Sequence, residues 1–301
     1  MSVLCYHKID DDCADWNGIV TPTDVFRRHM EYIVENYEVL PTSEIEKGER
    51  AVSISFDDGY ADGYYNALPI LEEYGVPATF FVSTARIGSS EEDWCNELSR
   101  LIIEGGIRNN EVCACGIRLS TESRLDRRWA NRQLFKFMLD MDVESRNREM
   151  GLLREWSGTE GRQPRRQFRM LNQEELKELS QSPLVTIGSH TVNHPSIGRL
   201  SISDQLYELA ESKDLLERLT GSSVTQFAYP FGGLSDYSEE TMDLLQRLGY
   251  ERAFSTTRKC YRRNSPYEIC RRCVGNVAIN ELKQAIKSQW NEQFQLEPQQ
   301  E

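Results

Sequence analysis

Short stretches of alternating apolar and small polar residues recur along the chain, and longer stretches with helical periodicity separate them. Residues 52–56 read Val-Ser-Ile-Ser-Phe and run into the turn sequence Asp-Asp-Gly at 57–59, which predicts a strand followed by a loop. A helix is predicted over residues 24–37 before this strand, and another strand over 78–82 after it. The first part of the chain therefore alternates strands with helices.

Residues from about 88 to 170 interrupt this rhythm. They are rich in Arg, Asn and Glu and contain two amphipathic helical stretches, around 94–103 and 128–156. We interpret this segment as a helical insertion or cap. Beyond it the alternation resumes, with helices predicted at 173–180, 203–219 and 238–248 and strands at 184–188, 224–229 and 252–255.

The order of these elements predicts the fold class. Strands that alternate with helices pair in parallel through right-handed crossover connections, which favours an α/β fold, either a barrel of the (β/α) type or a wound sheet. A length of 301 residues allows one large domain or two small ones. We expect a single domain over residues 1–301, with the insertion inside it and a frayed polar tail after residue 290.

Composition and charge exclude several classes of protein. The longest apolar runs are too short to cross a membrane, so no transmembrane segment is expected. A net charge of -13 at pH 7 argues against nucleic-acid binding, because phosphate recognition needs a basic surface. Basic residues gather at 162–169 and at Arg262, Arg263, Arg271 and Arg272. We interpret them as solvated basic faces, with an anionic nucleotide or lipid head group as the alternative ligand. The amino terminus lacks the pattern of a secretory signal, so a cytoplasmic location is expected.

The chain contains eight cysteines, which are scattered rather than grouped. In a chain of this length without a secretory signal, free thiols are expected rather than a disulfide framework. Cys113-x-Cys115 and Cys270-x-x-Cys273 could together hold a structural zinc ion, although the first spacing is tighter than usual. Ordinary thiols are the preferred interpretation.

Three short segments stand at the ends of predicted strands: Asp57-Asp58-Gly59, Ser189–Pro195 and Phe227–Gly232. The carboxyl ends of the strands share one face of a (β/α) barrel, and active sites gather there. His190 and His194 are four residues apart, so a tight loop or one helical turn can aim both imidazoles at one point, and Asp58 would add a carboxylate oxygen. Such a set leaves open positions on a divalent metal ion.

Each of these features has a simpler interpretation when it is taken alone. Asp-Gly after a strand is ordinary turn chemistry, and two loop histidines can serve only as hydrogen-bonding groups. Their joint occurrence at strand ends favours a metal site.

These motifs resemble those of the polysaccharide deacetylase family, the NodB-like carbohydrate esterases, and the resemblance covers nearly the whole chain. Ser-Phe-Asp-Asp-Gly at 55–59 resembles the first motif of the family, which implies that Asp57 is the catalytic base and Asp58 a metal ligand. Ser-His-Thr-Val-Asn-His-Pro at 189–195 resembles the second motif, which implies that His190 and His194 are metal ligands.

Residues 227–232 resemble the third motif, which shapes the substrate groove and supplies a backbone N–H to the oxyanion. The resemblance implies that Tyr229 and Pro230 belong to the groove and that Phe231 donates the N–H. The family's third motif usually carries an arginine that orients the base, and Ala228 stands at the matching position. Control of the base must then come from elsewhere in the chain.

The family's usual late histidine, its general acid, is also absent, since no histidine follows His194. Leu-Cys-Tyr-His-Lys-Ile at 4–9 resembles the amino-terminal segment of the biofilm-polysaccharide branch, in which an early histidine takes that role. This resemblance implies that His7 is the general acid; the alternative is a histidine that is only part of the core or surface. His29, in a predicted helix, is interpreted as structural.

The resemblance thus implies a distorted (β/α) barrel of the polysaccharide deacetylase type and a metal-dependent hydrolase that removes the N-acetyl group from an amino sugar, releasing acetate. The substrate would be an N-acetylated oligo- or polysaccharide, free or linked to a lipid or nucleotide. Zn²⁺ is the expected metal, and Co²⁺, Ni²⁺ or Fe²⁺ also suit imidazole and carboxylate ligands. Two alternatives remain: a carbohydrate-binding protein with a degenerate site, and a hydrolase of a non-sugar amide. The sequence leaves the oligomeric state open.

Overall fold

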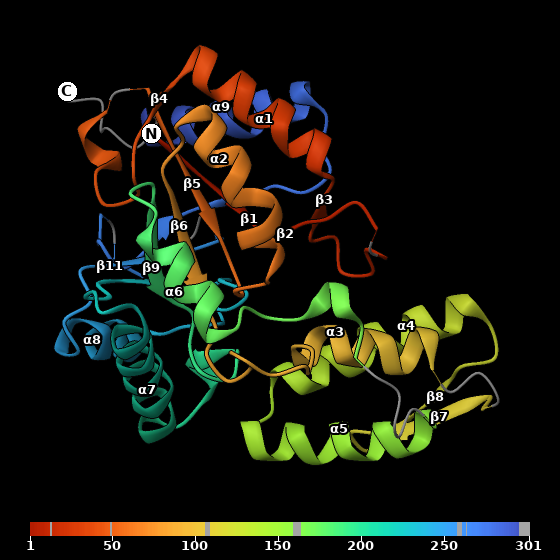
Figure 1. Cartoon of the computed structure of the whole chain (residues 1–301). Coiled ribbons are helices and arrows are strands. Elements are labelled where there is room, and N and C mark those ends of the chain that lie inside the picture. Colours follow the sequence, from red (N-terminus) through yellow and green to blue (C-terminus); the bar gives the residue numbers. More distant parts are fainter. Residues whose placement is uncertain are drawn as a thin grey trace, which may run out of the picture.

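The computed structural model describes residues 1–12, 14–48, 50–105, 109–158, 164–257, 261–262 and 264–294, with the backbone alone for 290–294. The described strands of the main sheet all pair in parallel, in the order β12-β11-β10-β9-β6-β5-β1-β13, with β4 beside β5. Eight of them form a nearly closed barrel, which confirms the predicted α/β barrel (Figure 1). The nine described strands of the sheet, β4 included, are β1 (Ser2–Tyr6), β4 (Glu38–Val39), β5 (Ala51–Phe56), β6 (Ala78–Val82), β9 (Val185–Ser189), β10 (Gln226–Ala228), β11 (Arg252–Ser255), β12 (Ile269–Cys270) and β13 (Arg272–Cys273).

The two ends of this strand order are neighbours in the sequence. β12 pairs with β11 and β13 pairs with β1, and only Arg271 separates β12 from β13. The Arg271 N–H donates to the Ser255 carbonyl at 2.8 Å, and the Val274 N–H donates to the Cys5 carbonyl at 2.8 Å. This segment nearly closes the barrel, and the sequence pattern did not predict it.

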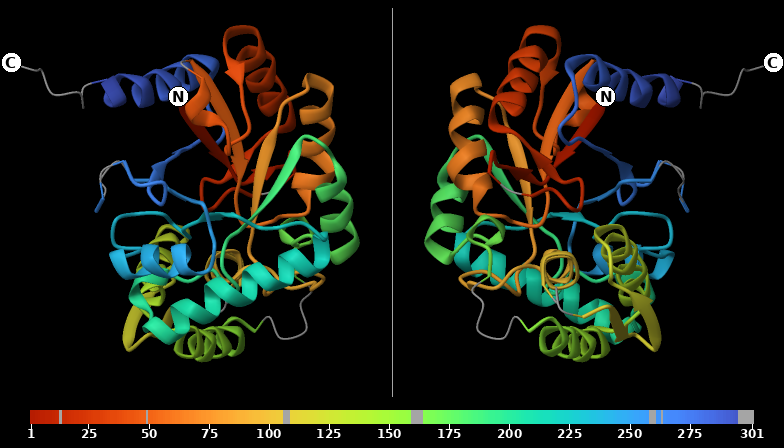
Figure 2. Two further views of the ribbon diagram at one scale, coloured as in Figure 1. Left: turned by 90° about the vertical axis from the view of Figure 1, so that its left-hand side faces the viewer. Right: turned by 90° about the vertical axis from the view of Figure 1, so that its right-hand side faces the viewer.

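Helices surround the strands (Figures 1 and 2). Those outside the insertion are α1 (Thr23–Asn36), η1 (Ile45–Lys47), η2 (Gly63–Ala67), α2 (Leu68–Tyr74), η4 (Arg166–Phe168), α6 (Gln173–Gln181), η5 (Ile197–Arg199), α7 (Ile202–Thr220), α8 (Glu239–Arg247) and α9 (Ile279–Phe294). The short strands β2 (Lys8–Ile9) and β3 (Val20–Thr21) pair with each other outside the barrel. The predicted helices at 24–37, 173–180, 203–219 and 238–248 are therefore confirmed, whereas α9 was not predicted.

The alternating apolar and polar side chains of β5 point to two faces of the strand, and both faces are buried. Val52, Ile54 and Phe56 pack in the large apolar core, where the Phe56 ring stacks on Phe80 with 4.6 Å between centroids. Ser53 and Ser55 are equally buried, and the Ser55 hydroxyl accepts a hydrogen bond from Arg271. The polar positions of the pattern are thus not a solvent face, because both faces of a barrel strand are covered.

The insertion between β6 and β9 is built from α3 (Trp94–Ser99), η3 (Arg100–Glu104), β7 (Glu111–Ala114), β8 (Ile117–Ser120), α4 (Arg124–Leu139) and α5 (Val143–Ser157). It lies to one side of the barrel (Figure 1) and has an apolar core of its own, which includes Trp94, Leu98 and Leu134.

The prediction of one helical stretch over 128–156 was wrong. The stretch is divided between α4 and α5, because the Asp142 side chain accepts the Ser145 N–H and caps a new helix. The β7–β8 hairpin was also not predicted. Its two strands are short and half exposed, so they carry little apolar signal.

α9 continues to Phe294, four residues beyond the predicted start of a frayed tail, and the rest of that tail lies outside the described residues. The single-domain assignment stays a prediction. No helix in the described ranges is both long enough and apolar enough to cross a bilayer.

Candidate active site

The predicted site residues lie in loops whose backbone is unusually constrained. Asp58, Thr191, His194 and Phe231 all have positive φ angles, of 73°, 68°, 52° and 63°. Such a conformation is costly for a residue with a side chain and clusters at functional sites. Gly59 is required next to them, since a Cβ there would lie 2.7 Å from a Val82 side-chain carbon.

Asp58, His190 and His194 converge at the carboxyl ends of β5 and β9. The Asp58 Oδ1 atom lies 3.4 Å from His190 Nε2 and 3.2 Å from His194 Nε2. All three side chains are buried. Burial raises the pKa of Asp58, but the two histidines outweigh it and hold that pKa well below its usual value.

These three residues fit a divalent metal ion. Ligand atoms about 2.0–2.1 Å from a tetrahedral ion stand about 3.3 Å apart, which matches the two measured separations. The His190 Nδ1 atom lies 2.7 Å from the Ala228 carbonyl, so an Nδ1–H bond there leaves Nε2 free to bind a metal. His194 Nδ1 is buried and has no hydrogen-bond partner among the described residues.

The insertion holds the histidine loop in place. The Trp94 indole N–H of α3 donates to the His194 carbonyl at 3.0 Å, and an Arg146 guanidinium nitrogen of α5 lies 2.7 Å from the Asn193 carbonyl. The Arg146 guanidinium also lies over the Trp94 ring, 4.6 Å from its centroid. The insertion therefore supports the site directly.

Asp57 is paired with Arg271, the residue at the seam between β12 and β13. Two guanidinium nitrogens donate to the two Asp57 oxygens at 2.6 and 2.7 Å, and both side chains are buried. Arg271 thus holds Asp57 in one orientation, as the family's motif arginine would do from the position where this chain has Ala228. The interpretation of Arg271 as part of a solvated basic face was wrong, because closure of the barrel carries this side chain inward.

Arg271 also sets the charge state of Asp57. Burial alone would raise the pKa of this carboxyl, but the Arg271 guanidinium, and next His190, lower it below its usual value. Asp57 is therefore ionised at neutral pH. The other predicted basic cluster is also partly paired, since Arg165 and Arg169 form ion pairs with Glu92 and Glu175.

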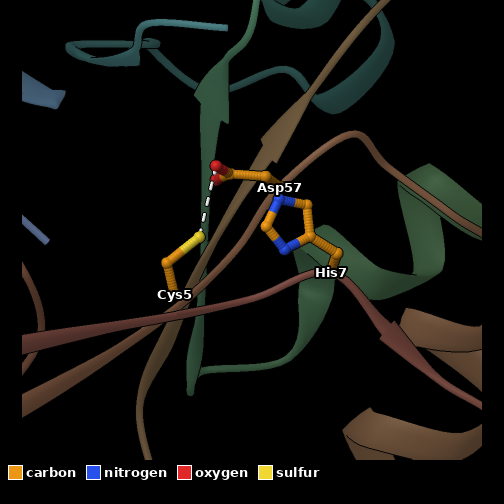
Figure 3. Close-up of side chains that lie close together, drawn as sticks. All are labelled: Cys5, His7 and Asp57. Atoms are coloured by element: carbon orange, nitrogen blue, oxygen red, sulfur yellow. Dashed lines mark hydrogen bonds between the residues drawn. The ribbon is translucent and has the colours of Figure 1, made fainter. Parts of the chain in front are cut away.

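His7 lies beside Asp57, together with Cys5 (Figure 3). A ligand atom of each of these three residues lies within 4.8 Å of the others, and the Cys5 thiol donates to Asp57 Oδ2 at 3.3 Å. The fold thus brings His7, the residue indicated by the resemblance to the early-histidine branch, next to Asp57. His29 is buried in α1, where its ring bonds the Tyr6 hydroxyl and the Val277 carbonyl.

A cavity of about 570 Å³ opens onto these groups. Its wall includes Asp57, Asp58, His7, His190 and His194 from the barrel, Phe231 and Tyr229 from the third motif, and residues of the insertion. The Phe231 ring lies 4.8 Å from the His194 ring, and no described group accepts the Phe231 N–H. Pro230 is buried and does not line the cavity.

Cys273 was missed as a residue of the site. It stands opposite Cys5 in the β1–β13 pair and lines the cavity. The neighbouring Cys5 side chain lowers the pKa of the Cys273 thiol most and, with His7 and Arg271, outweighs desolvation to bring it to about 6. The sequence indicated Arg271 only as part of a basic cluster and Cys273 only as part of a possible zinc pair, because the pairing of β12 with β11 and of β13 with β1 is what brings both residues here. Cys5, Cys95, Cys113, Cys115 and Cys273 are free thiols. Among the described residues, none of the possible metal groups combines the two Cys pairs.

Alkylation of Cys273 by iodoacetamide is expected to follow its thiolate fraction, with a midpoint near pH 6. Mass spectrometry of the Cys273 peptide across a pH series measures it. Cys115, whose pKa burial raises to about 12, is the internal control and should stay unlabelled at neutral pH. A Cys273 midpoint at the ordinary value of about 8.5 would contradict the assigned environment.

The profile of the family described as polysaccharide deacetylase matches residues 44–114 and 129–253. Among curated proteins, YxkH of Bacillus subtilis (strain 168), named for the same family, is 23% identical over 265 residues, which is 85% of this chain and 64% of YxkH. The poly-beta-1,6-N-acetyl-D-glucosamine N-deacetylase of Escherichia coli (strain K12) is 28% identical over 86 residues, 26% of this chain and 13% of that protein. The chain thus spans less than two thirds of the length of these relatives.

Two solved structures resemble the whole fold. The Streptococcus pyogenes deacetylase PplD, in complex with acetate, superposes with a TM-score of 0.60 at 20% identity, covering 95% of this chain and 97% of PplD. IcaB from Ammonifex degensii superposes with a TM-score of 0.59 at 19% identity, covering 95% of each chain. At these identities the likeness is one of fold.

Proposed function

We propose, from the premise that this chain belongs to the polysaccharide deacetylase family, that it is a metal-dependent hydrolase that removes the N-acetyl group from an N-acetylated amino sugar. Family membership supports an amide-hydrolysing deacetylase. The metal, the substrate and the role of each residue are part of this proposal.

The observation that carries the proposal is the adjacency of two groups with different chemistry. Asp58, His190 and His194 present three metal-binding atoms at one point. Asp57 directly precedes Asp58 in the chain, but its carboxylate is bound by Arg271 and does not belong to this group of three ligand atoms. One aspartate is thus suited to bind a cation and its neighbour to accept a proton.

Asp58, His190 and His194 would hold the divalent cation, with Zn²⁺ as the first choice. When bound, such a cation supplies Lewis-acid chemistry, lowering the pKa of water and polarising a carbonyl. Asp57, ionised and held in one orientation by Arg271, takes the proton of the attacking water. The Phe231 N–H, which has no acceptor within the described residues, donates to the oxyanion that develops on the acetyl group.

The departing amine needs a proton, and we assign its donation to His7. The ring stands next to Asp57 and opens onto the same cavity (Figure 3). In this scheme Asp57 accepts a proton from water and His7 gives one to the sugar nitrogen. The products are acetate and the free amino sugar.

Replacement of His7 by Ala is expected to lower kcat by about 10²–10⁴-fold while the bound metal is retained, because the three ligands are untouched. Steady-state kinetics and metal analysis of the same preparation measure both effects. His29→Ala is the comparison that separates a catalytic from a structural loss, since His29 is buried behind Tyr6 and does not line the cavity. A His7→Ala enzyme with the kcat of the wild type would remove His7 from the mechanism.

A substrate panel tests the reaction class. Acetate release from N-acetylated oligosaccharides, but not from cyclic imides or other non-sugar amides, is the expected result. Turnover of the non-sugar amides alone would favour the second enzymatic alternative. Saccharide binding without hydrolysis in the metal-loaded protein would favour a degenerate, binding-only site.

A further inference from the structure

The helical insertion brings two arginines to the cavity that holds the candidate active site. Arg128 and Arg132 of α4 both line this cavity, together with Asn131 and Phe135. Positions 128 and 132 are one turn apart, so their side chains lie on the same face of the helix. The two arginines therefore line the same cavity as Asp58, His190 and His194.

These two arginines have no carboxylate partner. Both are exposed, and neither makes an ion pair or hydrogen bond within the part of the chain that the structure describes. Their neighbour Arg127 is different: it is buried and donates to the carbonyls of Ile102 and Gly105. Arg127 thus has a structural role in α4, whereas the guanidinium N–H groups of Arg128 and Arg132 can donate to a ligand in the cavity.

The surroundings favour binding rather than a solvated surface. The Arg128 guanidinium lies 5.2 Å from the centroid of the Trp16 ring, which limits its freedom before any ligand arrives. Glu104, the carboxylate beside Trp16, is engaged by the Trp16 indole N–H and by Arg165. Both of these bonds end on Glu104 Oε1, and no ion pair joins Glu104 to Arg128 within the described residues.

Position in the cavity distinguishes this pair from other basic residues. The whole chain carries a net charge of -13. Arg124 also has no ion pair within the described residues, but it does not line the cavity, whereas Arg128 and Arg132 do. At the barrel end of the cavity, Arg271 already neutralises Asp57, and a divalent cation would offset Asp58. Asp93, a third carboxylate of the cavity wall, accepts the Cys95 N–H and forms no ion pair with Arg128 or Arg132 within the described residues. The guanidinium groups of these two arginines are therefore open to a ligand.

We propose that Arg128 and Arg132 form a subsite for an anionic group, a phosphate or a carboxylate, carried by the N-acetylated sugar whose acetyl group is removed at the barrel. This inference rests on the proposed function and names the substrate class: an acidic rather than a neutral N-acetyl sugar. Guanidinium groups suit such oxyanions because they donate two parallel hydrogen bonds.

The test compares three probes with the metal-loaded protein: neutral di-N-acetylchitobiose, a nucleotide-linked N-acetylglucosamine that carries phosphate, and N-acetylglucosaminyl-N-acetylmuramic acid, which carries a carboxylate. Acetate release gives kcat/KM, and calorimetry gives Kd independently of turnover. The wild type is expected to favour at least one acidic probe over the neutral one by about 10- to 100-fold, the effect of a charge-assisted hydrogen bond. The probe that is favoured tells phosphate from carboxylate.

The Arg128→Gln/Arg132→Gln double variant is expected to lose this preference, and the Lys variants to recover part of it. Arg124→Gln is the matched control, because Arg124 lies over the same Trp16 ring, 5.1 Å from its centroid, but does not line the cavity. It should keep the preference of the wild type. Raising the salt concentration should weaken the preference, since exposed charges are screened.

The outcomes separate this inference from the proposed function. Hydrolysis of all three probes with equal kcat/KM, or a preference that survives in the double Gln variant, overturns the subsite while the deacetylase proposal stands. Arginine-dependent binding of an acidic probe without acetate release supports the subsite, and the deacetylase proposal then falls.

Discussion

Asp58→Ala, His190→Ala and His194→Ala proteins are expected to lose both the bound divalent cation and all measurable acetate release. The three proposed ligand atoms are Asp58 Oδ1 and the Nε2 atoms of His190 and His194, which lie within 3.4 Å of it. Each variant removes one of these atoms, and the two that remain do not hold the cation. Elemental analysis after gel filtration measures the metal, and acetate production measures the reaction. We expect this to be the largest effect of any substitution in the chain.

Asp57→Asn is the matched comparison, because it alters the adjacent residue. It should keep the metal but lower kcat by about 10²–10⁴-fold, since a carboxamide cannot act as the base. Its stability should also fall, because the buried Arg271 loses a charged partner. Loss of metal in Asp57→Asn, or full activity in Asp58→Ala, would show that the two aspartates do not have the roles assigned to them.

Arg271→Met is expected to lower the free energy of unfolding by about 3–5 kcal/mol, as the removal of one partner of a buried ion pair does. Arg271 and Asp57 are both buried and joined by two hydrogen bonds, so the variant leaves an uncompensated carboxylate inside the barrel. Activity should fall as well, because Asp57 loses the group that orients it. Chemical denaturation and steady-state kinetics measure the two losses.

Arg272→Met is the control for this change. Arg272 is the next residue, half-buried, with a hydrogen bond to the Ser288 hydroxyl, so its loss should cost less than about 1 kcal/mol. The difference in free energy of unfolding between the wild type and Arg271→Met should become smaller as the pH falls. The pKa of Asp57 in the folded protein is depressed, so the stability from the pair is present at neutral pH and is lost as acid protonates this carboxyl. Equal stability of Arg271→Met and Arg272→Met would show that the buried Arg271–Asp57 pair does not stabilise the fold as proposed.

The barrel strands and the proposed metal ligands could be predicted because their signals are local. A strand that ends in Asp57-Asp58-Gly59 and a His-x-x-x-His pair after another strand are visible in a few residues each. The parallel barrel then follows from the alternation of strands and helices, since strand carboxyl ends share one face. Asp58, His190 and His194 meet there.

The partner of Asp57, the proposed base, could not be predicted, because it depends on a long-range pairing. β12 and β13 have two residues each, too few for a periodic signal, and they form only where β11 and β1 offer free edges. From the sequence alone, Arg271 was therefore interpreted as one of several basic residues near the end of the chain. Its inward direction follows from the alternation of side chains in an extended strand, once the pairing is known.

The insertion shows a second limit. Its amphipathic helices could be predicted, but their contacts could not. Trp94 and Arg146 bind the loop that carries His194, and Arg128 and Arg132 line the cavity. These contacts depend on how α3, α4 and α5 dock, and the helical periodicity identifies only which face is apolar.

Acetate release from an N-acetylated oligosaccharide by the purified protein tests the central claim most directly. The assay is run on the protein as isolated, after chelation, and after re-addition of Zn²⁺, with Asp58→Ala treated in parallel. We predict that chelation abolishes acetate release, that Zn²⁺ restores it in the wild type, and that Asp58→Ala stays inactive throughout. Acetate release that persists at full rate in the metal-free wild type would contradict the account.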